Sequence, residues 1–417
     1  MDYDVIVVGA GITGLSSAYH MKEDNPDLNI LVLDRAHTYA QGNTAKSAAG
    51  FRDVFTSDIS YNLSSSTAGY YDHVQRDLGV NLGMRHSGYL FLLDDDRNVE
   101  VLEDLSKKTK IRKIGMDELK GIGINSSVSE ETGKILGVGS IRHAYLAYNC
   151  GILEPDLIAQ YYYNELIKKG VSFSFDTEVK RLMLEPTKKL NFPGEPFIWQ
   201  DKEISGLETT RGILKADTYI LATDVWTTPI LDPTGIDSHI RPKKRQLFRV
   251  RSDMIEKMVS DVSLGTESFP FTVFPKGVYI RPNPVEKAFW AGVADDIGRD
   301  FSFVEDPQPE ETFYNYNVYQ IAQAYMDAFS NSRIVGSWAG YYSYNTIDGN
   351  PYIFRELNMI VATGTSGSGI LKGDAVGRVV SSLYSKKEYS DLYGGKRIRT
   401  SDLGLVGRKV MPERLVL

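Results

Sequence analysis

Residues 4–14 read DVIVVGAGITG, and residues 30–34 read ILVLD after an intervening helix-like stretch. The apolar run before the glycines predicts a buried parallel strand. Gly9 permits a tight turn, Gly11 lets the backbone approach a diphosphate, and Gly14 lets the following helix pack closely on the strand. The diphosphate would then meet free N–H groups and the positive end of the helix dipole. The order of strand, turn, helix and second strand predicts a βαβ unit that binds a dinucleotide.

Asp34 ends the second strand of this unit, about twenty positions after the last glycine, where a carboxylate accepts hydrogen bonds from ribose hydroxyls. Strand, glycine turn, helix and terminal acid fall here in the required order, which makes the signal more specific than the glycines alone. Ile12, Thr13 and Arg35 flank these positions and belong to the same candidate cofactor-binding set.

Composition limits what kind of protein this is. A chain of 417 residues is too long for one core, so two domains are expected. A formal net charge of −7 argues against a general affinity for nucleic acid or for anionic membranes. The single cysteine, Cys150, excludes an internal disulfide framework and any cysteine-rich metal site. The six histidines show no metal-ligand spacing with one another or with carboxylates, so no metal is expected.

The sequence opens at Met1 with a predicted strand three residues later, so no signal peptide is expected. No apolar run is long enough to span a bilayer. We therefore expect a cytoplasmic protein without a membrane span.

Segments typical of a nucleotide-binding domain recur near the start, the middle and the end of the chain, with β-rich segments between them. This pattern predicts an α/β protein in which a Rossmann-like domain is interleaved with a β-rich substrate domain of mixed sheet plus helices. The expected boundaries are 1–80, 145–235 and 334–385 for the first domain, 81–144 and 236–333 for the second, and 386–417 for a C-terminal tail.

Five blocks in a fixed order carry a family resemblance. The first covers residues 9–34, and the others read NTAKSAAGFR at 43–52, NCGILEP at 149–155, ADTYILATDVW at 216–226, and WAG at 338–340 with DGNP at 348–351 and TGTSGSG at 363–369. Over residues 3–384 the chain resembles the D-amino-acid oxidase, glycine oxidase and sarcosine oxidase family of FAD-dependent enzymes. It is most similar to the dehydrogenase-like sarcosine and proline members.

The resemblance implies FAD as cofactor and adds further binding residues. The late glycine loop follows a strand and opens a helix, so its backbone supplies a second set of donors, which in the family stabilises the pyrimidine edge of the reduced ring. Asp224 departs from the glycine that usually ends the preceding nucleotide-domain strand. The added candidates are Thr44, Ala45, Lys46, Ser47, Val179 beside the adenine, Thr223, Trp226, Gly364, Gly367, Gly369 and Ile370.

Candidate substrate-binding and catalytic residues come from the same resemblance, read beside their chemistry. An arginine fork suits the carboxylate of an amino acid. Tyr279 and Arg281 alternate with Ile280, so both are expected on one face of a strand. The candidates are Arg52, Tyr279, Arg281, Tyr341, its neighbour Tyr342, and Lys372 just inside the last helix. The alternative for each is a plain structural role, as a surface ion pair, a packed aromatic ring or a solvated lysine.

Two absences refine the expectation. Members that bind FAD covalently use a cysteine before the Thr-Pro-Asp segment, and here residues 341–348 read YYSYNTID, so non-covalent FAD is expected. An ungapped comparison places Trp290 where the sarcosine oxidase branch has a lysine for oxygen activation, with Lys287 nearby but out of register. Loss of that cation favours a dehydrogenase over an oxidase.

The resemblance implies that the chain oxidises the C–N bond of an amino acid or secondary amine such as proline, sarcosine or glycine, by hydride transfer to flavin N5. The electron acceptor is either O2 or a quinone-type carrier. Two alternatives stay open. One is FAD-dependent oxidation of a hydroxy acid or glycerol phosphate, and the other is a flavin-holding electron-transfer subunit of a larger complex.

Overall fold

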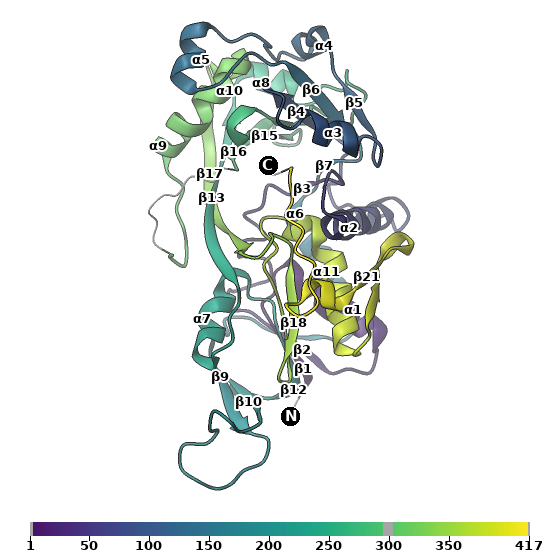
Figure 1. Cartoon of the computed structure of the whole chain (residues 1–417), viewed down its shortest axis with the longest axis vertical. Helices are drawn as coiled ribbons and strands as arrows, with labels where there is room; N and C mark the ends of the chain where they lie inside the picture. Colours follow the sequence, from purple (N-terminus) through teal and green to yellow (C-terminus); the bar gives the residue numbers. More distant parts are fainter. Residues whose placement is uncertain (1–2, 295–302, 416–417) are drawn as a thin grey trace.

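Two large β-sheets organise the chain, one in each half of an elongated molecule (Figure 1). The computed structural model describes residues 3–294 and 303–415. The chain passes between the halves several times, so each half is assembled from segments that are distant in sequence. The expected α/β architecture, with interleaved nucleotide-binding and β-rich segments, is confirmed.

A six-stranded sheet forms the lower half in Figure 1. Its strands run parallel except for the edge strand β18, which pairs antiparallel with β19. In spatial order the strands are β18 (Tyr352–Glu356), β19 (Met359–Thr363), β12 (Ala216–Leu221), β1 (Tyr3–Val8), β2 (Ile30–Leu33) and β8 (Ser172–Ser174).

Both faces of this sheet are buried, which explains the continuous apolar runs in its strands. Val5 and Val7 of β1 pack into a core shared with the helices, whereas Ile6 and Val8 pack into a second core on the opposite face. The second core is closed by an antiparallel sheet of β9 (Val179–Pro186), β10 (Lys202–Thr209) and β11 (Gly212–Leu214).

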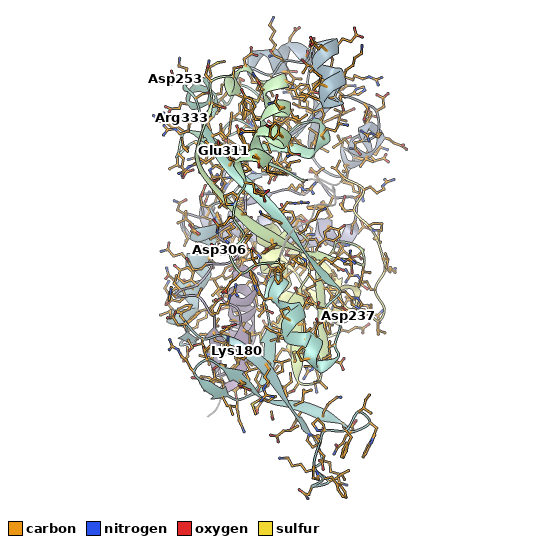
Figure 2. The ribbon with its side chains drawn as sticks, turned by 90° about the vertical axis from the view of Figure 1, so that its left-hand side faces the viewer. Lys180, Asp237, Asp253, Asp306, Glu311 and Arg333 are labelled. Carbon is orange, nitrogen blue, oxygen red and sulfur yellow. The ribbon has the colours of Figure 1, made fainter. Side chains whose placement is uncertain are left out.

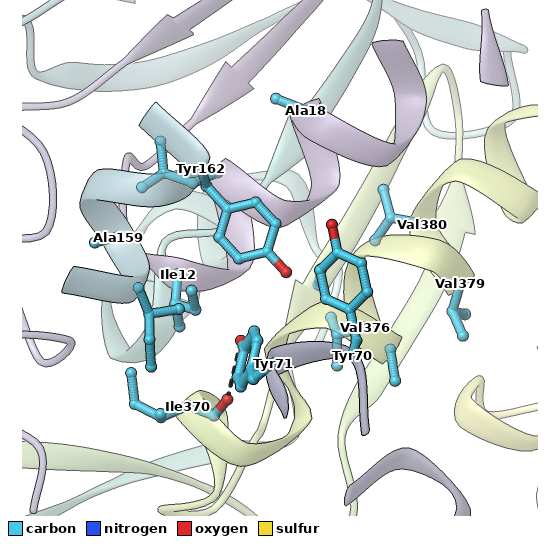
Figure 3. Close-up of a cluster of buried hydrophobic side chains, with 14 of the residues drawn as sticks. Ile12, Ala18, Tyr70, Tyr71, Ala159, Tyr162, Ile370, Val376, Val379 and Val380 are labelled. Atoms are coloured by element: carbon cyan, nitrogen blue, oxygen red, sulfur yellow. Dashed lines mark hydrogen bonds between the residues drawn. The ribbon is translucent and has the colours of Figure 1, made fainter. Parts of the chain in front are cut away.

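Four helices cover the first face and pack against one another (Figure 3). They are α1 (Ile12–Asp24), α2 (Asp58–Arg76), α6 (Pro155–Lys168) and α11 (Gly369–Tyr384). Tyr71 of α2 donates a hydrogen bond from its hydroxyl to the carbonyl of Ile370, at 3.3 Å (Figure 3). This contact ties α2 to the first turn of α11, the helix that follows the late glycine loop.

An eight-stranded mixed sheet forms the upper half. Its strands in order are β17 (Arg333–Asn345), β13 (Ile240–Arg251), β16 (Ala288–Val293), β15 (Val278–Asn283), β14 (Phe271–Val273), β4 (Tyr89–Leu93), β6 (His143–Ala147) and β5 (Ile111–Lys113). One face packs against short helices, namely α4 (Met116–Gly121), α5 (Glu130–Leu136), α8 (Asp253–Met258), α9 (Glu311–Phe313) and α10 (Gln320–Tyr325). The other face turns toward the nucleotide-binding half.

Alternation along β15 decides which side chains reach the second face. Val278 and Ile280 pack into the core under the short helices. Tyr279 packs into the core on the opposite face, where Trp290 also lies, and the Arg281 guanidinium lies 4.2 Å from the centre of the Trp290 ring. The prediction that Tyr279 and Arg281 share one face is therefore confirmed.

Strand pairing refines two of the expected segment boundaries. Residues 145–147 belong to β6 and residues 334–345 belong to β17, and both strands pair within the eight-stranded sheet, although the sequence grouped them with the nucleotide-binding half. Short motifs in these segments resemble the family's nucleotide-domain blocks, but backbone pairing continues the upper sheet through them.

The C-terminal residues expected as a tail are ordered against both halves. β20 (Tyr389–Asp391) pairs with β21 (Arg397–Arg399), and the chain then turns back toward the space between the halves (Figure 1). Leu415 is buried there in the core that contains Tyr89 and Tyr279. Within the described ranges, no helix has the length and apolar character needed to cross a membrane.

Candidate active site

In the turn between β1 and α1 the main chain packs so closely that two glycines have no space for a side chain. Gly9 has a φ of +104°, and a Cβ there would lie 2.5 Å from the carbonyl oxygen of Ala222 at the end of β12. A Cβ on Gly14 would lie 1.8 Å from the carbonyl oxygen of Gly9. The first turn of α1 is thereby held against the strand ends, with its N-terminus facing a cavity.

Asp34 is fixed at the rim of this cavity by main-chain donors. Its Oδ2 accepts a hydrogen bond from the Ala10 N–H at 2.7 Å, and its Oδ1 accepts one from the Ala36 N–H at 2.9 Å. A carboxylate offers about four lone-pair sites, so two N–H donors leave capacity for the hydroxyls of a ribose. The side chain therefore shapes the turn and faces the cavity at once.

The cavity has a volume of about 540 Å³, which lies within the about 300–1,000 Å³ typical of ligand sites. It runs from the β1–α1 turn to the inner face of the upper sheet. Most of the cofactor-binding residues expected from the sequence line it, namely Gly9, Gly11, Ile12, Thr13, Asp34, Arg35, Thr44, Lys46, Ser47, Val179, Thr223, Trp226, Gly367, Gly369 and Ile370. Gly14, Ala45 and Gly364 lie outside the lining. Glycine backbone, a helix N-terminus and a rim carboxylate in one elongated cavity fit an extended dinucleotide such as FAD.

Asp224, which replaces the family's glycine, is accommodated in this wall. Its φ is +50°, a left-handed conformation that aspartate tolerates better than most residues. Its Oδ2 accepts a hydrogen bond from Asn43 Nδ2 at 2.5 Å, and Asn43 Oδ1 accepts one from the Tyr341 N–H at 2.8 Å. Burial raises the pKa of Asp224. This side chain links the small-residue loop to β17 across the cavity.

Glu305 and Asp306, in the described segment before α9, line one side of the cavity. Glu305 pairs with Arg35 at 3.1 Å, and Asp306 pairs with Lys46 at 3.0 Å. Arg35 also lies over the Trp226 ring, 4.2 Å from its centre. These ion pairs connect this segment to the nucleotide-binding half at the cavity's rim.

Tyrosines from two strands of the upper sheet form the opposite wall. Tyr279, Tyr341 and Tyr342 all line the cavity. Burial raises the pKa of Tyr279 well above its ordinary value, so its phenol stays protonated and can donate a hydrogen bond. A Cβ on Gly367 would lie 2.3 Å from the Tyr342 ring, so the late glycine loop packs directly on this tyrosine.

Arg245 lines the same wall and was missed by the sequence reasoning. It lies on β13 opposite Gly340 of β17, with its guanidinium 5.1 Å from the centre of the Tyr342 ring. The signal available was a basic run, Lys243-Lys244-Arg245, in a strand expected from its alternation. Such a run usually indicates a solvated face of a strand. For this reason the sequence did not single out Arg245, which lines the cavity.

Arg52 and Lys372 are buried together behind the lining. The Arg52 guanidinium lies 4.2 Å and the Lys372 Nζ lies 5.1 Å from the centre of the Phe55 ring. Arg52 Nη1 donates to the Val54 carbonyl at 3.0 Å, and Lys372 Nζ donates to Ser60 Oγ at 2.9 Å. Within the described ranges, neither cation pairs with a carboxylate closer than 4.0 Å.

Burial lowers the pKa of both cations. Desolvation lowers the pKa of Arg52. It lowers the pKa of Lys372 to about 7, with a further contribution from the Arg52 charge, while Glu413 acts in the opposite direction. Glu413 accepts hydrogen bonds from the Thr56 N–H, at 2.8 Å, and from the Thr56 hydroxyl. The C-terminal segment thus places one carboxylate near two buried cations.

Arg281 and Cys150 have different surroundings. Arg281 donates from Nε to the Ala48 carbonyl at 3.0 Å, and from Nη2 to the Leu153 carbonyl and to Glu154 Oε1 at 2.6 and 2.9 Å. It therefore fastens the small-residue loop and β7 (Gly151–Ile152) to the upper sheet and does not line the cavity. Cys150 is buried, with Sγ 3.9 Å from Asp53 Oδ1, also outside the lining. The part of the chain that the structure describes holds no cluster of three potential metal ligands.

Comparisons with known proteins agree with this geometry. A family model described as FAD dependent oxidoreductase (DAO) matches residues 4–383. A Bos taurus protein named FAD-dependent oxidoreductase domain-containing protein 1 is 25% identical over 416 residues, covering 91% of this chain and 80% of the relative.

Two solved structures share the fold over nearly their whole length. L-proline dehydrogenase from P. horikoshii superposes with a TM-score of 0.73 at 22% identity, covering 97% of this chain and 96% of that one. Glycine oxidase from Geobacillus kaustophilus gives a TM-score of 0.73 at 16% identity, covering 98% and 99%.

Proposed function

The chain belongs to the FAD dependent oxidoreductase (DAO) family, and from this premise we propose that it oxidises the C–N bond of an amino acid or a secondary amine. FAD is its cofactor, and the protein is an FAD-dependent oxidoreductase. The observation that carries the proposal is the cavity wall opposite the nucleotide-binding turn, where three tyrosines and Arg245 present hydroxyl groups and a guanidinium that fit the carboxylate of an amino acid. The glycine oxidase and proline dehydrogenase names of two structural relatives point to the same substrate class.

The nucleotide-binding wall holds the cofactor, which when bound supplies a two-electron acceptor. When FAD is bound, the N-terminus of α1 would hold its diphosphate and Asp34 its ribose. The late glycine loop, at the N-terminus of α11, would hold the flavin ring. No cysteine lines the cavity among the described residues, which supports non-covalent binding. Release of all flavin into the supernatant after acid precipitation is the expected result.

The opposite wall binds and orients the substrate. Arg245, which lines this wall, supplies the positive charge for a carboxylate, and the hydroxyls of Tyr279 and Tyr342 supply neutral donors. Arg52 adds a second positive charge from behind the lining. Arg281, whose donors hold three oxygens of the loop framework, positions this wall from behind.

Lys372 adjusts the protonation of the substrate amine. An amine gives up hydride only from its neutral form, because the nitrogen lone pair must be free. Lys372 lies behind the lining with Nζ bonded to Ser60 Oγ, so it would act on the amine through its charge and not by direct proton transfer. With a pKa of about 7, the Lys372 Nζ is partly unprotonated near neutral pH, and this charge weakens as the pH rises.

We also propose that electrons leave to a carrier other than O2. Trp290, at the position of the oxygen-activating lysine, donates from Nε1 to Glu286 at 2.9 Å and lies beneath Arg281. Lys287 is exposed on the turn between β15 and β16 and does not line the cavity. Air-saturated turnover should give little hydrogen peroxide, whereas a dye or quinone acceptor should support fast turnover. Equal rates with both acceptors would refute this assignment.

Anaerobic mixing of the purified FAD-loaded protein with a panel of compounds tests the function. The panel contains glycine, sarcosine, proline, D-amino acids, a hydroxy acid and glycerol phosphate, and flavin absorbance is followed. Bleaching by an amine or amino acid is expected. Bleaching only by glycerol phosphate or the hydroxy acid overturns the C–N assignment. No bleaching, together with copurification of a second chain, would assign the protein to an electron-transfer complex instead.

A further inference from the structure

The connection between β9 and β10 projects from the end of the molecule remote from the upper sheet (Figure 1, bottom). Residues 187–201 form this projection, and side chains stand out from it into open surroundings below Lys180 (Figure 2). We call residues 187–201 the hairpin tip. It belongs neither to the cavity nor to either large core.

Four large apolar side chains of the hairpin tip are exposed within ten residues of sequence. Ile198 is 93% exposed, Trp199 71% and Phe192 65%, and Leu190 is also exposed. A second group, at residues 405–411 of the C-terminal segment, includes Val406 and Val410, but it does not lie on a projection. Other exposed apolar residues, such as Ile135 and Val285, are separated along the sequence, which is ordinary for a protein surface. A concentration of this kind on one projection marks a contact site.

Hydrogen bonds hold the hairpin tip in a defined shape with these side chains outside. The Glu195 carboxylate accepts from the Leu190 and Phe192 N–H groups, at 3.0 and 2.8 Å. Gln200 donates from Nε2 to the Lys188 carbonyl at 3.0 Å and accepts from the Phe197 N–H at 3.0 Å. The polar side chains of Glu195 and Gln200 therefore bond to the backbone of the hairpin tip itself. These bonds fix the loop with its apolar side chains exposed to solvent.

We propose that the hairpin tip inserts into the interfacial layer of a lipid bilayer. A protein partner of standard size buries about 800 Å² per side with matched shape, whereas Phe192 and Trp199 carry about 150–250 Å² each on a narrow convex projection. A bilayer demands no shape complementarity, and Trp sits well at the boundary between headgroups and acyl chains.

Local charge does not oppose this occupant. Lys188 and Lys189 are exposed next to the apolar side chains, but Lys189 pairs with Glu185 at 2.9 Å, and the hairpin tip also contains Glu195 and Asp201, so its formal charges balance. The whole chain carries a formal charge of −7, so global attraction to anionic lipid does not drive the contact. Apolar insertion should therefore proceed on zwitterionic vesicles as well, with weak dependence on salt.

The experiment uses the full FAD-loaded chain with vesicles of phosphatidylcholine, alone or with phosphatidylglycerol. The wild type is expected to sediment with the vesicles. Its Trp fluorescence should shift to shorter wavelength when vesicles are added, and this shift should be absent in the Trp199→Phe variant. Ile198→Ser combined with Trp199→Ser should reduce the bound fraction at least tenfold. Flavin content and thermal unfolding should not change, because both side chains lie outside the cores.

Ile135→Ser is the matched control, since Ile135 is 75% exposed on α5 at the opposite end of the molecule (Figure 1). It should bind vesicles like the wild type. Absence of vesicle binding, or equal loss in Ile135→Ser and in the hairpin-tip variant, overturns the proposal. Conversion of a dimer to a monomer by the hairpin-tip substitutions, measured by light scattering, would assign the surface to a second copy and overturn it too.

Discussion

The two walls of the cavity differ in whether main chain or side chains form them. The nucleotide-binding wall consists largely of main chain, because the turn at Gly9, the N-terminus of α1 and the late glycine loop present backbone groups. The opposite wall consists of side chains, namely three tyrosines and Arg245, from strands far apart in sequence. At Gly9 and Gly14 the first wall leaves no space for an added atom, whereas the second can change its substrate by changing side chains on a constant backbone.

Gly14→Ala should have the largest effect, because it breaks the main-chain wall. The new Cβ would lie 1.8 Å from the Gly9 carbonyl oxygen, and no rotamer change relieves a clash with backbone. The cost lies at or above the upper end of the about 1–3 kcal/mol of ordinary overpacking. We expect purified protein with almost no flavin, measured by absorbance per chain. Gly121→Ala, where a Cβ meets nothing within 4 Å, is the control and should keep its flavin. A fully yellow Gly14→Ala protein would contradict the account of this wall.

Arg245→Gln should break the side-chain wall alone, because Arg245 lines that wall. A hydrogen bond to a charged group contributes about 1.5–3 kcal/mol, so we expect kcat/KM for an amino-acid substrate to fall about 10–100-fold with flavin content unchanged. For an amine that lacks a carboxylate, kcat/KM should fall much less, and comparing the two substrates is the decisive measurement. Loss of flavin in Arg245→Gln would show that the two walls are not separable.

Lys372→Met tests the buried ammonium through the pH dependence of stability. The folded pKa of about 7 lies below the usual value of 10.5, so between these values the unfolded chain binds more protons than the folded one. The free energy of unfolding should therefore rise with pH across this window, by up to about 1.4 kcal/mol per pH unit. Denaturant titrations at pH 6 to 9.5 should show a steeper rise in the wild type than in Lys372→Met. If the free energy of unfolding rose equally with pH in both proteins, the pKa of Lys372 would not be lowered in the folded state.

Asp306→Asn should have the smallest effect, because it removes a side-chain contact from the main-chain wall. The Asp306 carboxylate is 72% exposed in its pair with Lys46, and exposed ion pairs contribute little. We expect FAD affinity to change at most about twofold, with the difference disappearing at high salt. A change above tenfold would mean that side chains also govern the first wall.

The same contrast explains what the sequence could predict. The βαβ fingerprint is local, so the turn, the helix and Asp34 followed from neighbours along the chain. The shared face of Tyr279 and Arg281 followed from strand alternation. The contacts of Arg281 could not be predicted in this way, because its acceptors at Ala48 and Leu153 are 233 and 128 positions away in the sequence. Arg245 and Glu413 were not predicted for the same reason. The pairing of β13 with β17 brings Arg245 to the site, and the returning C-terminal segment brings Glu413 there.

The interleaving of the halves has a consequence for synthesis of the chain. β1 contains residues 3–8, yet the neighbours that complete its sheet include β19 at residues 359–363, and its covering helix α11 follows at 369–384. A ribosome must therefore release nearly the entire polypeptide before the nucleotide-binding core closes. Until then its apolar strands lack partners, and this exposed apolar surface is prone to aggregation.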